Sequence, residues 1–192
     1  MTLSNTALSG NDCFYSDDIE TTPDEAKNAY KAKFPQKLLV YVVMSPQNVS
    51  KAFIFPSGTA VNQFAYRDEC LKKILVPFVR ANYRHGQYVF WPDLASAHYA
   101  KKVQEYLKKE KIPYVPRNIN PANVPKARPI EDFWALLKQK VYEGDWQAKS
   151  LKILKRRITW CLSKINRKNF LSLSASVHKR LNTVAKYGVD AL

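Results

Sequence analysis

The sequence predicts an α/β fold in which helices flank a mixed sheet. Two apolar runs, residues 37–45 and 51–56, have the composition of buried strands and lie close enough together to form a hairpin. Two shorter apolar runs, residues 88–91 and 112–115, are separated by a segment with helical spacing. A strand, a helix and a second strand in this order are typical of parallel strands joined by a crossover.

The N-terminal residues 1–36 are polar and acidic and show no sustained period. We expect a long loop there, with a short strand at Cys13–Ser16. The run Lys37–Ser45 is continuously apolar and bounded by prolines, which predicts a buried strand. Lys51–Pro56 predicts the second strand of the hairpin.

Helical periodicity begins in the segment Val61–Val79, whose apolar residues form one core-facing stripe. Pro77 is expected to kink or end this helix near Leu75 or Val76, because proline lacks the N–H that a helix interior needs. A second helix is predicted over Ser96–Lys109. Its expected buried residues are Ala100, Val103, Tyr106 and Leu107.

Five of the eleven prolines fall between Pro113 and Pro129, so this stretch predicts an extended loop. A helix from Ile130 to about Tyr142 should follow it. A basic amphipathic helix is predicted over Lys149–Ile165. We therefore divide the chain into a polar segment (1–36), an α/β core (37–145) and a basic helical tail (146–192).

Composition excludes several classes of protein. The three cysteines lie far apart and form no C-x-x-C pair, so neither a zinc site nor a disulfide scaffold is expected. No stretch approaches the roughly 18 apolar residues that span a bilayer, and the N-terminus does not resemble a signal peptide. We expect a soluble intracellular chain with no membrane partner and no small-molecule substrate.

The net charge of +15 is concentrated in the C-terminal part. Residues 137–192 hold thirteen Lys or Arg against three acids, a net charge of +10, whereas residues 1–36 carry −3. Such an asymmetry favours a polyanion partner, and basic residues interleaved with aromatic residues indicate nucleic acid. A solvated face that only keeps the chain soluble is the alternative.

Two short acidic motifs carry the chemistry. Asp93 follows the apolar run at residues 88–91, and Glu131 lies in the first turn of the predicted helix after Pro129. Carboxylates that converge at the carboxyl end of parallel strands can bind Mg²⁺, and divalent cations drive phosphodiester chemistry. Taken singly, Asp93 could instead cap a helix, and Glu131 and Asp132 could stabilise one through its dipole.

His98 lies five residues after Asp93. It could contact phosphate or steady the acidic site, and a half-buried structural role is an equal alternative.

These motifs resemble the catalytic domain of the mariner superfamily of Asp-Asp-Glu/Asp transposases, which has a ribonuclease H-like fold. The run Trp91-Pro92-Asp93-Leu94-Ala95-Ser96-Ala97-His98 is similar to the family's second acidic motif. Asn120-Pro121 and the run Pro129-Ile130-Glu131-Asp132-Phe133-Trp134 are similar to its third. The resemblance covers most of the chain, and 37 residues separate Asp93 from Glu131, slightly more than is usual in the family.

The resemblance implies that Asp93 and Glu131 are catalytic acids that bind Mg²⁺ or Mn²⁺. It also implies DNA as the partner and the nucleus as the location, and leaves a homodimer open. His98 matches a recurrent family position whose role stays open. Together with the basic residues of the C-terminal part, it completes the candidate nucleic-acid-binding set: His98, Lys152, Lys155, Arg156, Arg157, Arg167 and Lys168.

The chain departs from the family pattern at its start. Met1-Thr2-Leu3-Ser4 resembles the segment that follows the family's first acid, so most of the first, central strand and its Asp are expected to be missing. Asp17 and Asp18 are candidates to replace that acid. The resemblance therefore implies a fragment of a transposase catalytic domain with weak or no activity. A non-catalytic DNA-binding protein derived from a transposase is the alternative, and a generic RNA-binding protein ranks below both.

Overall fold

The computed structural model describes residues 1–4, 20, 36–122, 124–188 and 191. The expected strand at Cys13–Ser16 and the candidate acids Asp17 and Asp18 lie outside the described residues. No helix within the described ranges is long and apolar enough to cross a membrane.

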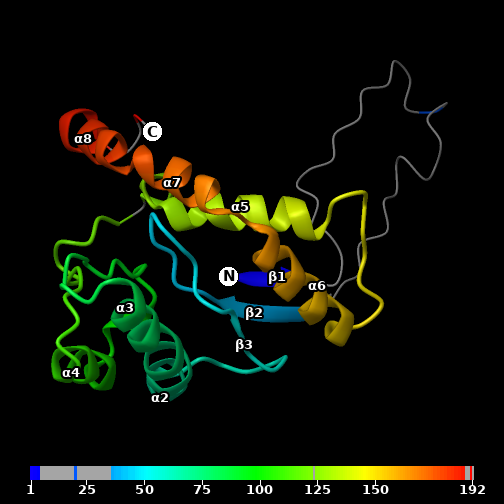
Figure 1. Ribbon diagram of the computed structural model, residues 1–192, viewed down its shortest axis with the longest axis horizontal. Helices are drawn as coiled ribbons and strands as arrows, with labels where there is room; N and C mark the ends of the chain where they lie inside the picture. Colours follow the sequence, from blue (N-terminus) through cyan, green and yellow to red (C-terminus); the bar gives the residue numbers. More distant parts are fainter. Residues whose placement is uncertain (5–19, 21–35, 123, 189–190, 192) are drawn as a thin grey trace.

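A three-stranded antiparallel sheet lies at the centre of the fold (Figure 1). It consists of β1 (Thr2–Ser4), β2 (Lys37–Tyr41) and β3 (Phe53–Ile54), with β2 in the middle. The pairing of β2 with β3 confirms the predicted hairpin. β1 pairs with the other edge of β2, so that Leu3 lies opposite Leu38.

The predicted parallel strands are reduced to one bridge. Phe90 N–H donates to the carbonyl of Pro113 at 2.8 Å, and Val115 N–H donates to the carbonyl of Phe90 at 2.9 Å. The two segments run parallel, as predicted, but they pair at one position instead of along two full strands. Both runs are short and next to proline, which cannot extend a ladder because it lacks the N–H.

The first helical segment is longer than predicted. α2 (Gln63–Ala65), a π-helical segment η1 (Tyr66–Leu75) and α3 (Val76–Asn82) follow one another without interruption. Pro77 was expected to kink or end the helix, and it does not end it, because the helix continues to Asn82. Val76 N–H bonds to the carbonyl of Leu71, five residues back, and Pro77 then occupies the first turn of α3, where no N–H is required.

The helix predicted over Ser96–Lys109 is broken in two. A 3-10 turn, η2 (Ser96–Tyr99), precedes α4 (Lys101–Lys109), and Ala100 between them is extended, with ψ of 148°. The break lets the Tyr99 hydroxyl donate to the carbonyl of Val115, while the Gln104 amide donates to the carbonyl of Tyr99. Long-range contacts thus override the continuous helical pattern.

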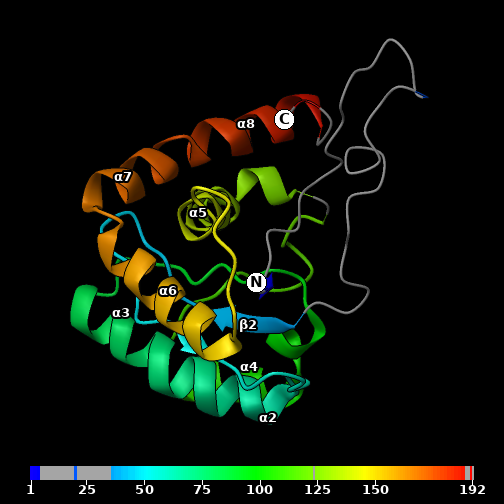
Figure 2. The same cartoon turned by 90° about the vertical axis from the view of Figure 1, so that its right-hand side faces the viewer.

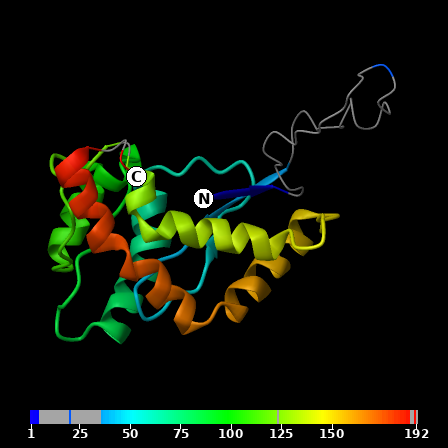
Figure 3. The same cartoon turned by 90° about the horizontal axis from the view of Figure 1, so that it is seen from above.

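The C-terminal half confirms the two predicted helices and adds two more. The elements are η3 (Pro125–Ala127), α5 (Pro129–Val141), α6 (Leu151–Lys164), α7 (Arg167–Ala175) and α8 (Val177–Tyr187). α5 contacts both α6 and α7, and Figure 3 shows α7 and α8 running beside it. The helices of the tail therefore pack against the core.

The sheet separates two hydrophobic clusters, because side chains on successive residues of β2 point to opposite faces. Leu38 and Val40 pack with α5 and α6, around Phe133 and Ile158. Leu39 and Tyr41 pack against the cluster formed by η1, α3 and α4. Figure 2 shows β2 between these two helical layers.

Asn62 caps the long helix, since its Oδ1 accepts hydrogen bonds from the N–H groups of Phe64 and Ala65, both at 3.0 Å. We expect Asn62→Ala to lower the free energy of unfolding by about 1 kcal/mol, because two N–H groups lose their acceptor. Urea unfolding measures the loss. Asn62→Asp keeps the acceptor and should remain near the parent protein; an equal loss in both variants would contradict the capping role.

Candidate functional site

Asp93 is fixed by a turn at the end of the short parallel strand. Its Oδ1 accepts a hydrogen bond from the N–H of Ala95 at 2.8 Å. This bond closes a local turn before η2, whose N-cap is Ala95 without a side-chain cap, so Asp93 does not cap the helix that follows, as sequence reasoning had offered as an alternative. It leaves the carboxylate half-exposed, with 54% of the side chain open to solvent. Its role as a metal ligand stays a prediction.

His98 pairs with Asp93. Its Nδ1 lies 2.8 Å from Oδ1 of Asp93 and 3.2 Å from that residue's carbonyl oxygen. A proton on Nδ1 is required for a bond to the carboxylate. The imidazole also packs on the Tyr66 ring, with 4.5 Å between ring centroids. The contact with Asp93 fits the role of steadying the acidic site, and the packing on Tyr66 fits the structural alternative; phosphate contact stays a prediction.

The environment keeps Asp93 ionised. The hydrogen bond from His98 lowers the pKa of the Asp93 carboxyl to about 2, from an ordinary value of 3.8, against the opposing effect of partial burial. Ala95 N–H and the Arg128 charge act in the same direction. An ionised carboxylate at neutral pH is the form that a divalent cation requires.

This pKa shift makes stability dependent on pH. Because the folded-state pKa lies below the ordinary value, the ionised carboxyl contributes stability above about pH 4 that disappears as the pH falls toward 2. We expect the stability difference between the parent protein and Asp93→Asn to be constant near neutral pH and to vanish over that interval. Urea unfolding as a function of pH measures it. Glu143→Gln, at an exposed acid, is the control; the same profile for both variants would refute the assignment.

Asn120 connects the two acidic motifs and is only 5% exposed. Its Oδ1 accepts from Nε1 of Trp91 at 2.8 Å and from Nη2 of Arg128 at 3.2 Å. Its Nδ2 donates to the carbonyl of Pro92 at 2.8 Å and to the Tyr99 hydroxyl at 2.7 Å. One side chain thus holds the residues just before Asp93 together with the residue that starts α5.

Arg128 is the second buried polar residue of this network, with 7% exposure. Its guanidinium lies over the Trp91 ring, 5.6 Å from the centroid, and Nη2 also donates to the carbonyl of Pro121 at 3.1 Å. The backbone of Arg128 is extended and forms the N-cap of α5. Its position therefore determines where α5 begins, and with it the place of Glu131 in the first turn of that helix.

Glu131 lies in the first turn of α5, and its exposed carboxylate makes no hydrogen bond or ion pair with any described residue. The neighbouring Asp132 is occupied instead, since its Oδ2 lies 2.6 Å from Nη1 of Arg180. The same nitrogen donates to the carbonyl of Lys126 at 2.6 Å. α8 therefore anchors the start of α5 through Asp132 and leaves Glu131 available.

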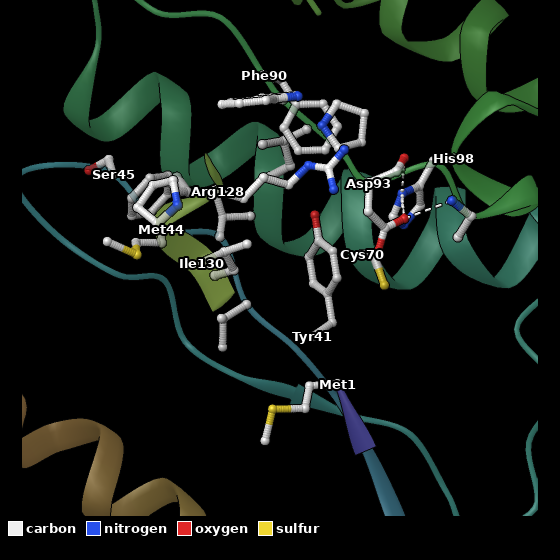
Figure 4. A pocket seen from close by; sticks show the side chains of 18 of the residues that line it. Met1, Tyr41, Met44, Ser45, Cys70, Phe90, Asp93, His98, Arg128 and Ile130 are labelled. Atoms are coloured by element: carbon white, nitrogen blue, oxygen red, sulfur yellow. Dashed lines mark hydrogen bonds and ion pairs between the residues drawn. The ribbon is translucent and has the colours of Figure 1, made fainter. Parts of the chain in front are cut away.

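Asp93 and Glu131 line the same cavity, which has a volume of about 760 Å³ (Figure 4). The Met1 amino group also borders it. Burial lowers the pKa of that amine, while the charges of Asp93 and Glu131 act against this effect. The two carboxylates, one from each acidic motif, are thus close enough to the same amine to influence its ionisation.

The cavity offers two carboxylates for a metal. Within the part of the chain that the structure describes, no group of three or more His, Cys, Asp or Glu side chains could hold an ion. Mg²⁺ commonly uses one or two carboxylates and keeps several waters, so two carboxylates on one cavity are the minimum that such a site needs. The identity of the ligands stays a prediction.

The predicted nucleic-acid residues of the tail are mostly exposed. Five of them lie on the surface of α6 and α7: Lys152, Lys155, Arg156, Arg167 and Lys168. Arg157 differs, because it donates to the carbonyls of Val141 and Lys140 at the end of α5 and lies between two tryptophan rings, each centroid at 5.2 Å. Its contacts tie α6 to α5, which leaves it less free for phosphate.

Sequence reasoning missed Asn120 and Arg128 as residues that organise the site. Asn120 and Arg128 both lie in motifs that the sequence analysis identified. What marks them as residues that organise the site is that their polar side chains are buried. Burial of a side chain depends on long-range packing, so the local sequence pattern around these two residues does not predict it.

The fold is shared with solved structures of Mos1 transposase. No family model matches the chain, and no curated protein matches it. Among solved structures, the Mos1 transposase paired-end complex with left transposon end superposes with a TM-score of 0.79 at 14% identity, covering 98% of this chain and 53% of the other. The Mos1 strand transfer complex gives 0.76 at 15% identity, with 98% and 52% coverage.

The Mos1 catalytic domain solved with Raltegravir and Mg gives a TM-score of 0.69 at 16% identity, over 80% of this chain and 76% of that domain. These similarities confirm the predicted α/β fold with its sheet flanked by helices. The chain spans about half the length of the transposases in the paired-end and strand transfer complexes.

Proposed function

We propose that the chain is a fragment of a mariner-type transposase catalytic domain with a ribonuclease H-like core, acting in metal-dependent cleavage and transfer of DNA strands. The observation that carries the proposal is the placement of Asp93 and Glu131 on one cavity, in a fold shared with Mos1 transposase. The Mos1 structures include complexes with transposon ends and with Mg or Mn, which supports DNA as partner and a divalent cation as cofactor.

In this proposal Asp93 and Glu131 hold Mg²⁺ or Mn²⁺. A bound divalent cation would make water more nucleophilic and stabilise the leaving oxygen of the phosphodiester. His98 keeps Asp93 oriented and ionised, as the low pKa indicates. Asn120 and Arg128 hold the two acid-bearing segments together.

Only two acids are proposed as ligands, so metal binding and cleavage should be weak. Two-metal phosphoryl transfer places two cations about 3.5–4 Å apart and needs more ligands than two carboxylates supply. The family motif that the sequence resembles includes a further, first acid, which the proposal assigns to none of the described residues. A non-catalytic DNA-binding role in the nucleus, with the tail contacting phosphates, is therefore the second candidate, favoured by the exposed basic residues of α6 and α7.

A plasmid nicking assay with Mg²⁺ or Mn²⁺ tests the two candidates. We expect little or no nicking, and weak Mn²⁺ binding by electron paramagnetic resonance that is lost in Asp93→Ala and Glu131→Ala. Glu143→Gln, at an exposed acid outside the cavity, should bind Mn²⁺ as the parent protein does. Binding unaffected by Asp93→Ala would contradict the assigned ligands. Robust nicking abolished by Asp93→Ala would show a complete active site and contradict the expected weakness.

A further inference from the structure

Helix α6 presents a large aromatic ring to solvent. Its buried face packs into the core through four residues: Leu154, Ile158, Cys161 and Leu162. Trp160 lies outside this face, and 53% of its surface is exposed. A single exposed apolar residue is common on protein surfaces and does not by itself indicate a function. The ring of Trp160 is distinguished by the groups that surround it.

Two cations of α6 flank the Trp160 ring. The Arg157 guanidinium lies 5.2 Å from the ring centroid, and the Lys164 amino group lies 5.9 Å from it. Residues three positions before and four positions after a side chain are its neighbours on a helix surface. The two cations therefore stand on the two sides of Trp160 along the helix axis, where the electrons of the ring attract them.

These two cations differ in how firmly they are held. Arg157 donates to the carbonyls of Val141 and Lys140, both at 3.3 Å. Its guanidinium also lies 5.2 Å from the ring of Trp146, which packs against the core. Lys164 is exposed, and its amino group makes no hydrogen bond or ion pair with any described residue. Arg157 therefore holds the Trp160 ring in place, whereas Lys164 can move aside and uncover it.

The charged residues of the sequence around Trp160 are all positive. No Asp or Glu occurs between Asp145 and Asp190. Lys155 and Arg156 are exposed on the same helix, and further exposed cations follow at the start of α7. Such a surface complements the phosphates of a nucleic acid, and an aromatic ring among cations is the group on which a nucleobase stacks.

We infer that Trp160 is a stacking platform for one unpaired nucleobase, which covers the side of the ring that Lys164 leaves when it moves to a phosphate. Arg156 and Lys164 lie four residues before and after Trp160 on the same side of α6, so they can bind the phosphates that flank the base. Inside a duplex both faces of a base are covered by its neighbours, so the platform selects single-stranded or unpaired nucleic acid. This role rests on the nucleic-acid binding proposed for the tail and specifies the form of nucleic acid that binds there.

The test uses the full chain and compares a labelled oligothymidine of about twelve nucleotides with a duplex of the same length, by fluorescence anisotropy. Trp160→Leu keeps an apolar side chain and removes the aromatic face. We expect its affinity for the single strand to fall about tenfold, while its affinity for the duplex stays close to that of the parent protein. Because no charge is lost, the slope of log K against log salt should not change. Lys164→Gln should instead reduce that slope for the single strand by about 0.7.

The matched control is Phe64→Leu in α2, because Phe64 is 49% exposed and has the Arg67 guanidinium 5.6 Å from its ring centroid. It should bind both nucleic acids as the parent protein does. An unchanged affinity of Trp160→Leu for the single strand, or an equal loss for both nucleic acids, would overturn the platform while leaving the tail a nucleic-acid-binding surface. If the parent protein bound neither nucleic acid, the proposed role of the tail would itself be overturned. Self-association that Trp160→Leu abolishes in sedimentation would assign the ring to a second copy of the chain and overturn the platform.

Discussion

Replacing Asn120 with alanine is expected to remove at least about 3 kcal/mol from the free energy of unfolding. The substitution deletes four hydrogen bonds, to Trp91, Arg128, Pro92 and Tyr99. Each buried group left without a partner costs about 1–3 kcal/mol, and more when it is charged. Arg128 keeps its bond to the carbonyl of Pro121, which moderates the loss. Urea unfolding measures the change.

The matched control is Asn182→Ala on α8, where the asparagine is exposed. Surface substitutions of this kind usually change stability by no more than about 0.5 kcal/mol. A loss below about 1 kcal/mol for Asn120→Ala would show that the network is not a cooperative unit. Trp91 fluorescence gives a second readout, because its Nε1 would lose its acceptor and the ring its fixed position beside Arg128.

The parts of the fold that the sequence predicts well are those governed by local pattern. β2, α5 and α6 carry long apolar runs or stripes, and their observed bounds lie within a few residues of the predicted ones. Hydrophobic periodicity already specifies which face of these elements is buried. Their packing against neighbouring elements therefore leaves their bounds close to the predicted ones.

The parts that the sequence does not predict depend on distant contacts. The break at Ala100 follows from bonds that join Tyr99 to Val115, sixteen residues away. The π-helical turns before Pro77 let a helix continue where local propensity predicts an end. The pairing of β1 with β2 joins residues more than thirty positions apart. In each case tertiary structure overrides a correct local rule.

The same distinction applies to the candidate site. Asp93 and Glu131 stand out in the sequence because each follows a recognisable strand or proline signal, and the structure places both on one cavity. The sequence left the role of His98 open, and its contact with the Asp93 carboxylate is what steadying that carboxylate would require. Asn120 and Arg128 escape prediction, because the burial that gives them their role arises only in the folded chain.

DNA binding by the tail should depend steeply on salt. If the exposed cations of α6 and α7 (Lys152, Lys155, Arg156, Arg167 and Lys168) each neutralise one phosphate, log K falls with log salt at a slope of about −4.5. The affinity for duplex DNA should then drop about 500-fold between roughly 50 and 200 mM salt, through release of counterions. Fluorescence anisotropy with labelled duplexes of unrelated sequence measures the slope.

The salt dependence should come from the positive charges of α6 and α7 and not from the net charge of the whole chain. The combined change of Lys152, Lys155, Arg156 and Lys168 to glutamine should reduce the slope to about −1, because each lost phosphate contact removes about 0.9. The control changes four exposed lysines to glutamine, three on α4 and one just after it, and so lowers the net charge by the same amount: Lys101, Lys108, Lys109 and Lys111. If the tail binds the DNA, the control should keep the slope of log K against log salt that the parent protein has. Equal slopes in the two variants would mean that net charge alone attracts the DNA.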